Sequence, residues 1–208
     1  MKITCKKCRR LGVSVCGRER CAISRKPYPP GKVRRMGRGS AGRWSGASLS
    51  DYGRQLRDKQ IVKFSYGLRE LQFKNYVLDA MTAKGKSSTD NLIAALERRL
   101  DNVVYRLNFA KSRRAARQLV SHGHICVNGR KVTIPSYAVK TGDLINVRPQ
   151  SRDKGFMRDF ETIIKKYQAP EWLNLDKEAV SGLMVGVPRT ESANFMGNIS
   201  TIVEFYSR

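Results

Sequence analysis

Residues 100–147 read LDNVVYRLNFAKSRRAARQLVSHGHICVNGRKVTIPSYAVKTGDLINV, and this stretch decides the fold class. Its apolar residues first recur at spacings of three and four, as in an amphipathic helix. Ser112 then provides an N-cap for a short second helix over 113–121. The pattern next changes to alternation, with an Asn-Gly turn at 128–129 between two short strands. With a third strand over 144–147, the stretch predicts two helices followed by a small antiparallel sheet.

Helical patterns also precede this unit. Ser50-Asp51 is a good N-cap pair, and the sequence after it predicts one helix, with another over 68–81. Thr89-Asp90 is predicted to cap the longest periodic segment of the chain, which continues as a single helix to Leu107. Most of the chain outside the small sheet is therefore predicted to be helical.

The C-terminal part of the chain gives a more mixed pattern. A helix is predicted from Asp153 until Pro170 stops it. The remainder is predicted to be loop with one or two strands, the last of them over the β-branched and aromatic residues 199–206. These apolar residues are expected to complete the helical domain and to face a protein neighbour.

The charge of the chain points to a polyanionic partner. Its 208 residues include 41 Lys and Arg and 17 Asp and Glu, a formal net charge of +24. Such a charge attracts nucleic acid first and an anionic membrane second. Residues 151–208 hold eight basic and eight acidic side chains, so polyanion contact is expected within the first 150 residues.

No stretch is long and apolar enough to span a membrane, and the N-terminus does not resemble a secretory signal. We therefore expect a cytoplasmic protein without a membrane partner. In a reducing compartment, clustered cysteines indicate metal binding rather than disulfides.

Four of the five cysteines follow the spacing C-x2-C-x7-C-x4-C near the N-terminus: Cys5, Cys8, Cys16 and Cys21. Tetrahedral Zn²⁺ requires about four such thiolates, and the segment has little apolar material with which to fold. The spacing predicts a structural Zn²⁺ site; free thiols or redox chemistry are the alternatives. Cys126, inside a strand, is expected to fill the core.

A curved basic surface, which includes His124, is predicted on the second helix and the hairpin after it. Its expected RNA contacts are Arg113, Arg114, Arg117, His122, Asn128, Arg130 and Lys131. Guanidinium groups suit phosphates because they donate two parallel hydrogen bonds. The alternative is an ordinary solvated helix face. A Pro-, Gly- and Arg-rich segment over 26–46 predicts an extended basic arm, and its Arg34 and Arg35 are further expected RNA contacts.

Patterns typical of enzymes do not stand out. The Gly-rich stretches match neither a phosphate loop nor a dinucleotide fingerprint. We find no nucleophile-His-carboxylate order and no HExxH motif, so we expect no catalytic residue, no small-molecule substrate and no enzymatic activity.

Residues 100–147 resemble the RNA-binding module named after ribosomal protein S-four. Three other segments are similar to the bacterial, zinc-bearing type of that small-subunit (30S) family: RKPYPPG at 25–31, SDYGRQLRDKQ at 50–60 and the terminal VEFYSR. The module alone would not identify the family, because pseudouridine synthases and tyrosyl-tRNA synthetases carry it too. The resemblance covers nearly the whole chain.

The resemblance implies a structural protein that binds small-subunit rRNA directly and nucleates early subunit assembly. It also implies contact with ribosomal protein S-five, a role with that protein in decoding accuracy, and a place near the mRNA entrance. It adds Arg54, Arg57 and Lys59 as RNA contacts and supports the four cysteines as zinc ligands. Seven residues between Cys8 and Cys16 are fewer than expected for zinc-bearing relatives, so the loop of this knuckle must be tighter.

The predicted fold class is α+β, a mostly helical domain with the α/β module inserted in it and a zinc knuckle at the N-terminus. The predicted boundaries are 1–45 for the knuckle and basic arm, 46–90 plus 155–208 for the helical domain with its C-terminal strand, and 91–154 for the module. The alternatives are a regulatory RNA-binding protein outside the ribosome or an RNA-modifying enzyme that uses the same module for targeting.

Overall fold

The computed structural model describes residues 3–18, 20–31, 49–83, 87–151, 164, 167–189 and 197–207. The chain divides into two compact units, Met1–Thr82 with Phe195–Arg208, and Ala83–Asn194. Arg34 and Arg35, with most of the predicted basic arm, lie outside the described residues, as does nearly all of the helix predicted from Asp153.

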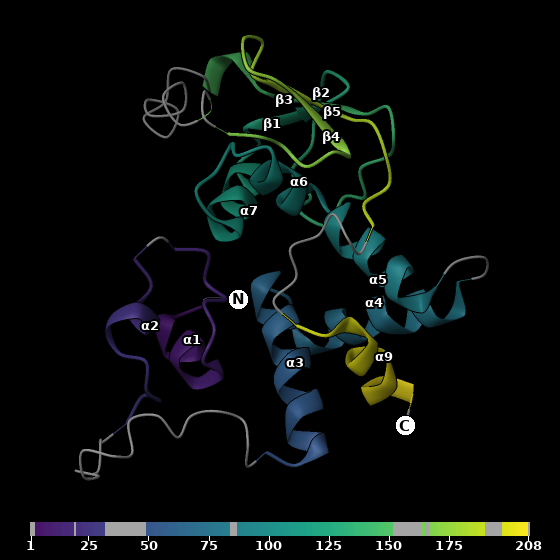
Figure 1. Ribbon diagram of the computed structural model, residues 1–208. Coiled ribbons are helices and arrows are strands. Elements are labelled where there is room, and N and C mark those ends of the chain that lie inside the picture. The colour runs from purple at the N-terminus through teal and green to yellow at the C-terminus, as the bar shows by residue number, and fades with distance from the viewer. Residues whose placement is uncertain are drawn as a thin grey trace. The chain divides into compact units, whose positions relative to one another are not determined.

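The described residues of the first unit form helices and the loops between them, and none of them lies in a strand (Figure 1). Its elements are α1 (Cys5–Leu11), α2 (Ala22–Arg25), α3 (Asp51–Ser65), α4 (Glu70–Thr82) and α9 (Ile199–Ser207). Ser50 caps α3 as predicted, because its Oγ accepts a hydrogen bond from Gly53 N at 3.2 Å. The core of this unit is formed by side chains from α3, α4 and α9, among them Val62, Phe73, Val77 and Ile202, each at most 2% exposed.

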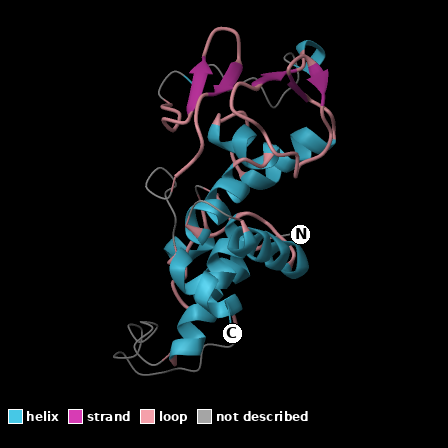
Figure 2. Ribbon diagram, turned by 90° about the vertical axis from the view of Figure 1, so that its right-hand side faces the viewer, coloured by secondary structure: helices cyan, strands magenta, loops and turns pink. Residues whose placement is uncertain are grey.

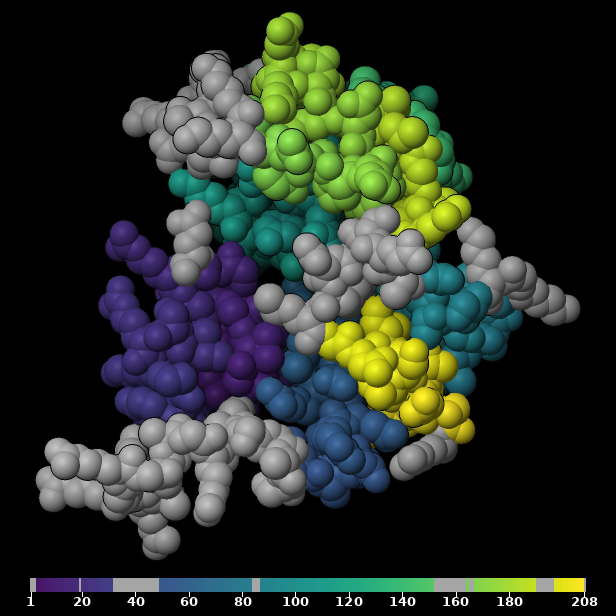
Figure 3. Space-filling model, viewed as in Figure 1, coloured from purple at the N-terminus to yellow at the C-terminus, as the bar shows by residue number. Residues whose placement is uncertain are grey.

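The predicted C-terminal strand is wrong, because residues 199–207 form helix α9. Ile199 and Ile202, three residues apart, are buried on one face of this helix. Helix α9 packs against α3 and α4, and Figure 3 shows it lying on the surface of α3. Tertiary packing along one helical face has thus overridden the β propensity of the segment.

A charged cluster joins α9 to the two other helices. Glu70 on α4 accepts a hydrogen bond from Lys63 Nζ at 2.6 Å and one from Tyr206 Oη at 2.9 Å, and it pairs with Lys59. Burial alone would raise the pKa of Glu70, but the hydrogen bonds from Lys59, Lys63 and Tyr206 outweigh it and lower the pKa to about 2. The Lys59 ammonium also lies 4.7 Å from the centre of the Phe205 ring.

The second unit combines helices with one antiparallel sheet, and the two form separate layers (Figure 2). Its helices are α5 (Ser88–Glu97), α6 (Leu100–Arg106) and α7 (Arg113–Ser121), with the short 3-10 helix η2 (Pro149–Ser151). Its strands are β1 (Ile125–Val127), β2 (Arg130–Lys131), β3 (Leu144–Val147), β4 (Leu173–Asp176) and β5 (Ser181–Met184). The strand order is β2-β1-β3-β5-β4, and every neighbouring pair is antiparallel.

The predicted hairpin and third strand are confirmed. Asn128 and Gly129 form the turn with positive φ angles of 50° and 76°, the conformation that an Asn-Gly turn favours. Strand β1 lies between β2 and β3, with Cys126 opposite Lys131 on one side and Asn146 on the other. Cys126 is 8% exposed, as expected of a core residue.

The single long helix predicted up to Leu107 is wrong, because the chain breaks between α5 and α6 at Arg98 and Arg99. Arg99 has an extended backbone and forms a β-bridge with Ala138. The amide of Leu100 donates to the carbonyl of Tyr137 at 2.8 Å, which satisfies a free donor at the start of α6. The spacing of three and four between apolar residues continues through the break, because α5 and α6 each bury one apolar face.

The predicted domain boundaries also require correction. Strands β4 and β5 lie within 155–208, which we assigned to the helical domain, but they extend the sheet of the second unit through the pairing of β5 with β3. Leu173 of β4, Met184 of β5 and Trp172, which directly precedes β4, belong to the same core as α6 and α7. Only the α9 segment of the C-terminal part returns to the helical unit.

Candidate nucleic-acid interface and metal centre

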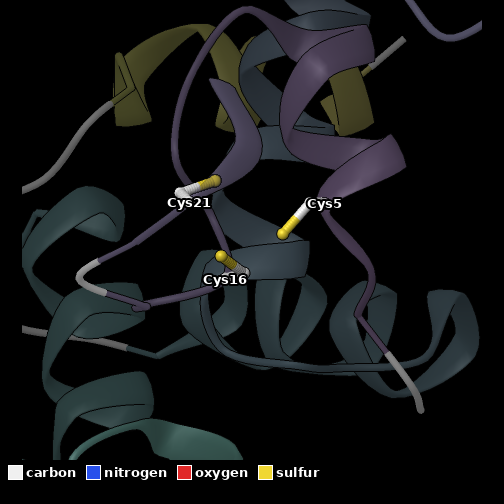
Figure 4. Close-up of side chains that lie close together, drawn as sticks. All are labelled: Cys5, Cys16 and Cys21. Carbon is white, nitrogen blue, oxygen red and sulfur yellow. The ribbon is translucent and has the colours of Figure 1, made fainter. Parts of the chain in front are cut away.

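The cysteine cluster is assembled from two short helices and the loop between them. Cys5 begins α1, Cys21 is the N-cap residue of α2, and Cys16 lies in the intervening loop. Their three Sγ atoms lie within 4.8 Å of one another and point toward a common centre (Figure 4). Four thiolates around Zn²⁺, each bonded at about 2.3 Å, have sulfurs about 3.8 Å apart, so the spacing fits a metal ion after a small contraction.

Cys8 belongs to the same cluster, although it lies deeper. Its side chain is fully buried on α1, and burial raises the pKa of the Cys8 thiol to about 12, to which hydrogen bonds with Cys16 and Cys21 add. Burial opposes ionisation at Cys21 as well, but hydrogen bonds, the first from the Ile23 amide, outweigh it and lower the pKa to about 7. All four predicted ligands are therefore neighbours, and they offer the soft donor set that Zn²⁺ favours.

The cluster is fixed to the helical unit by apolar and polar contacts. Leu11, Val15 and Ile61 pack with Cys8 and Cys21 in one buried cluster. The Nε atom of Arg57 on α3 donates to the carbonyl of Leu11 at 3.0 Å. The guanidinium of Arg57 thus serves to hold the cysteine segment on α3.

Helix α7 carries the predicted arginine face, but its three arginines point in two directions. Arg113 Nε donates to Asn102 Oδ1 at 2.7 Å, and its guanidinium lies 4.6 Å from the centre of the Tyr105 ring. Arg117 Nε lies 3.4 Å from Asp101 Oδ2. Both side chains therefore turn toward α6, while Arg114 is exposed.

The exposed stripe of α7 includes residues that the sequence analysis missed. Gln118 and Ser121 lie four and seven residues after Arg114, and both are exposed. His122 follows them and is also exposed. The helical period counted from Arg114, rather than from Arg113, would have found them, but charge alone did not show which arginine faces solvent.

The hairpin supplies the next two cations. Arg130 and Lys131 are exposed on β2. A Cβ atom at Gly123, the residue with φ 72° at the end of α7, would lie 2.2 Å from Lys131 Cε. The Lys131 side chain therefore crosses directly over Gly123, which places the strand's charge beside the end of the helix.

Asn128 and His124 have structural partners. The Asn128 amide donates to Asp143 Oδ1 at 2.8 Å and its Oδ1 accepts from the Leu144 amide at 2.9 Å, so its side chain ties the turn to β3. His124 Nδ1 lies 2.9 Å from Ser151 Oγ. These six exposed side chains of α7, its C-terminal end and β2 are named the RNA-facing stripe, after the RNA contact that the sequence predicts for this region: Arg114, Gln118, Ser121, His122, Arg130 and Lys131.

Comparison with known proteins identifies the family. The model described as S4 domain matches residues 98–145, and the model described as Ribosomal protein S4/S9 N-terminal domain matches residues 2–97. Small ribosomal subunit protein uS4 of Chloroflexus aurantiacus is 46% identical over 202 residues, covering 96% of this chain and 94% of the relative. The protein of that name from Syntrophomonas wolfei is 43% identical over 210 residues, covering 98% and 96%. The chain belongs to the ribosomal protein S4 (S-four) family.

The S4 family consists of structural components of the small ribosomal subunit, so this chain is a ribosomal protein of the cytoplasm and not an enzyme. The S4-domain match begins at the break before α6 and ends in β3, so it contains the whole RNA-facing stripe. Separately, no helix among the described residues is long and apolar enough to cross a membrane.

The three RNA contacts inferred for α3 from the S4 resemblance have different environments. Arg54 is exposed and pairs with Asp51 one turn away. Arg57 is partly buried against the cysteine segment. Lys59 is 8% exposed and its ammonium pairs with Glu70, so Lys59 belongs to the interior of the helical unit and does not fit the predicted role of an RNA contact.

Proposed function

We propose that this S4-family chain binds small-subunit rRNA directly through the RNA-facing stripe. The observation that carries the proposal is the contact between Lys131 and Gly123, which joins the cations of β2 to the exposed side of α7. A helix end and an adjoining hairpin together form a basic edge on a rigid sheet. Structured RNA is recognised largely by shape and by its phosphates, which such an edge suits.

A salt series tests this proposal. Wild-type protein and the triple variant Arg114→Ala, Arg130→Ala, Lys131→Ala are titrated with small-subunit rRNA by filter binding. Each phosphate contact contributes on the order of 0.7 to 0.9 to the slope of log K against log salt, so the slope should fall by about two. The matched control removes three exposed charges elsewhere, at Arg69, Lys74 and Lys177, and should keep the slope. Equal slopes for both triple variants would reject the proposed surface.

The proposal extends to the assembled subunit. Early assembly, contact with ribosomal protein S-five, a role with that protein in decoding accuracy, and a place near the mRNA entrance are supported by the family resemblance. The neutral tail of the chain suits a protein neighbour better than RNA, because its eight acidic side chains balance its eight basic ones. Crosslinking of assembled subunits should connect lysines of this chain with ribosomal protein S-five; crosslinks to other proteins alone would contradict that part.

We also propose that Cys5, Cys8, Cys16 and Cys21 hold one structural Zn²⁺. The metal would close a segment whose own apolar core is limited to a few side chains, such as Leu11 and Val15. Metal analysis should find one zinc per chain in the wild type and none in a Cys16→Ser, Cys21→Ser variant. Cys126→Ser, in the other unit, is the control and should retain the metal. Full zinc occupancy in the double variant would exclude this site.

A further inference from the structure

A buried polar network lies beneath the RNA-facing stripe, where the start of α6 meets α7. Glu97 is fully buried and accepts two hydrogen bonds from Arg106, at 2.9 and 2.7 Å. The Asn102 amide donates to Glu97 Oε2 at 2.7 Å, while its own Oδ1 accepts from Arg113. Asn102 is 1% exposed, and it therefore connects a buried carboxylate to an arginine of α7.

A second branch of the network reaches the same helix. Arg99, 1% exposed, donates to both carboxylate oxygens of Asp101, at 3.1 and 2.8 Å. Asp101, 5% exposed, also faces the guanidinium of Arg117 at 3.4 Å. Two neighbouring residues of α6 thus hold two arginines of α7 that are one turn apart.

The geometry points to a role for this network in RNA binding, and the inference rests on the proposed function. We propose that Asp101 and Asn102 are positioning residues that fix the rotation of α7, with Arg113 and Arg117 acting as their clamps. Successive residues of a helix differ by about 100° in direction. With Arg113 and Arg117 held on α6, Arg114 must project to the solvent side.

Directional contacts are suited to this task in a way that apolar packing is not. Apolar side chains tolerate small rotations and shifts of a helix, whereas a satisfied buried polar network accepts one arrangement. The exposed part of the Arg117 side chain is 30% of its maximum, against 7% for Asp101, so the clamp lies at the rim of the stripe. Removing a clamp should therefore disturb how Arg114 and the hairpin cations meet RNA together, without removing a phosphate contact.

The test separates positioning from phosphate binding. Arg117→Met and Arg114→Met both replace an arginine of α7 by an apolar side chain that preserves most of the aliphatic stem. Binding to small-subunit rRNA is measured over a salt series. Arg117→Met should weaken binding on the order of tenfold at constant salt slope. Arg114→Met should lower the slope by about one phosphate contact, on the order of 0.7 to 0.9.

For Asp101→Asn, the two explanations predict opposite changes in RNA affinity. Loss of a negative charge beside a basic surface should strengthen RNA binding by simple electrostatics, whereas loss of the clamp should weaken it. We expect weaker binding, and no additional loss when Arg117→Met is combined with it. Thermal melting establishes that each variant is folded; if Asp101→Asn does not fold, the comparison of the two methionine variants decides.

Two results would overturn the inference, and a third would reject the RNA surface on which it rests. A salt slope that falls as much in Arg117→Met as in Arg114→Met would make Arg117 a phosphate ligand and contradict a positioning role. Tighter binding by folded Asp101→Asn would likewise contradict a positioning role. An unchanged slope in Arg114→Met and in the triple variant of the stripe would instead reject the proposed RNA surface itself.

Discussion

Gly182 in β5 is predicted to be a glycine that tolerates no larger side chain. A Cβ atom at this position would lie 2.4 Å from Leu107 Cδ2 and 2.5 Å from its Cδ1. These distances are far below the 3.5 to 4.0 Å or so of favourable carbon contacts. Leu107 is fully buried at the end of α6, so it has little room to retreat. Gly182→Ala must therefore separate the sheet from α6 or distort the leucine.

The expected cost follows from that overlap. Overpacking of a filled core by a single group destabilises a protein by about 1 to 3 kcal/mol. A unit of this size loses roughly 4 to 8 °C in melting temperature per kcal/mol, so the second unit should melt about 4 °C lower or more. Thermal unfolding followed by circular dichroism and by differential scanning calorimetry measures the shift.

Gly186→Ala is the matched control on the same strand's continuation. Its nearest neighbour would be Trp172 Cβ at 3.8 Å, an ordinary contact. This substitution should be neutral or should stabilise the fold by up to about 1 kcal/mol, because alanine lowers the conformational entropy of the unfolded chain. Gly182→Ala combined with Leu107→Val should recover part of the loss, because it removes the colliding group. A melting temperature for Gly182→Ala equal to that of Gly186→Ala would refute the packing argument.

Three further predictions concern other parts of the chain. Because the pKa of Glu70 is lowered from 4.5 to about 2, its contribution to stability is complete above about pH 5 and is lost as the pH falls toward 2; Glu70→Gln should flatten the acid limb of a urea-unfolding series, and an unchanged limb would contradict this. Gly123→Ala should displace the Lys131 side chain and strain a residue at φ 72°, lowering rRNA affinity several-fold in filter binding, whereas Gly53→Ala on α3 should not. Deletion of residues 199–208 should lower the melting temperature of the helical unit yet leave rRNA binding by the S4 module in place; loss of rRNA affinity at an unchanged melting temperature would reverse the assignment of the tail.

Local signals in the sequence were sufficient for the hairpin and for α7. The Ser112 cap is confirmed by its hydrogen bond from Ala115 N at 3.2 Å, and the Asn-Gly turn adopts the conformation that its residues favour. The cysteine spacing likewise predicted a convergent cluster, because short spacings along the chain leave little freedom in space. Each of these features depends on residues that are close together in the sequence.

The wrong predictions involve distant partners. The break at Arg99 is caused by a segment about 40 residues later in the chain. The carbonyl of Tyr137 accepts a hydrogen bond from the first amide of α6, and Ala138 forms the β-bridge with Arg99. The β-branched and aromatic composition of residues 199–206 predicted a strand, but the helical conformation places Ile199 and Ile202 on one buried face, and the helix packs against α3 and α4. Leu71 is a large apolar residue and yet is 72% exposed, because Phe73 and Val77 occupy the inner face of α4. Contacts of this kind join residues that are far apart in the sequence, so the sequence of each segment alone does not predict them.

The arginines of α7 show why composition predicts a partner more readily than it predicts the contacts. The net charge of +24 and the cluster of three arginines both favour RNA, and both are properties of the sequence. Whether a given guanidinium is available to a phosphate depends on its partners within the protein. The partners of Arg117 and Arg113 are Asp101 and Asn102, which lie sixteen and eleven residues earlier on a different helix. A cation that satisfies a buried carboxylate no longer adds its full charge to the surface. The number of phosphates bound should therefore be smaller than the number of basic residues in the module, and the salt slope measures that difference directly.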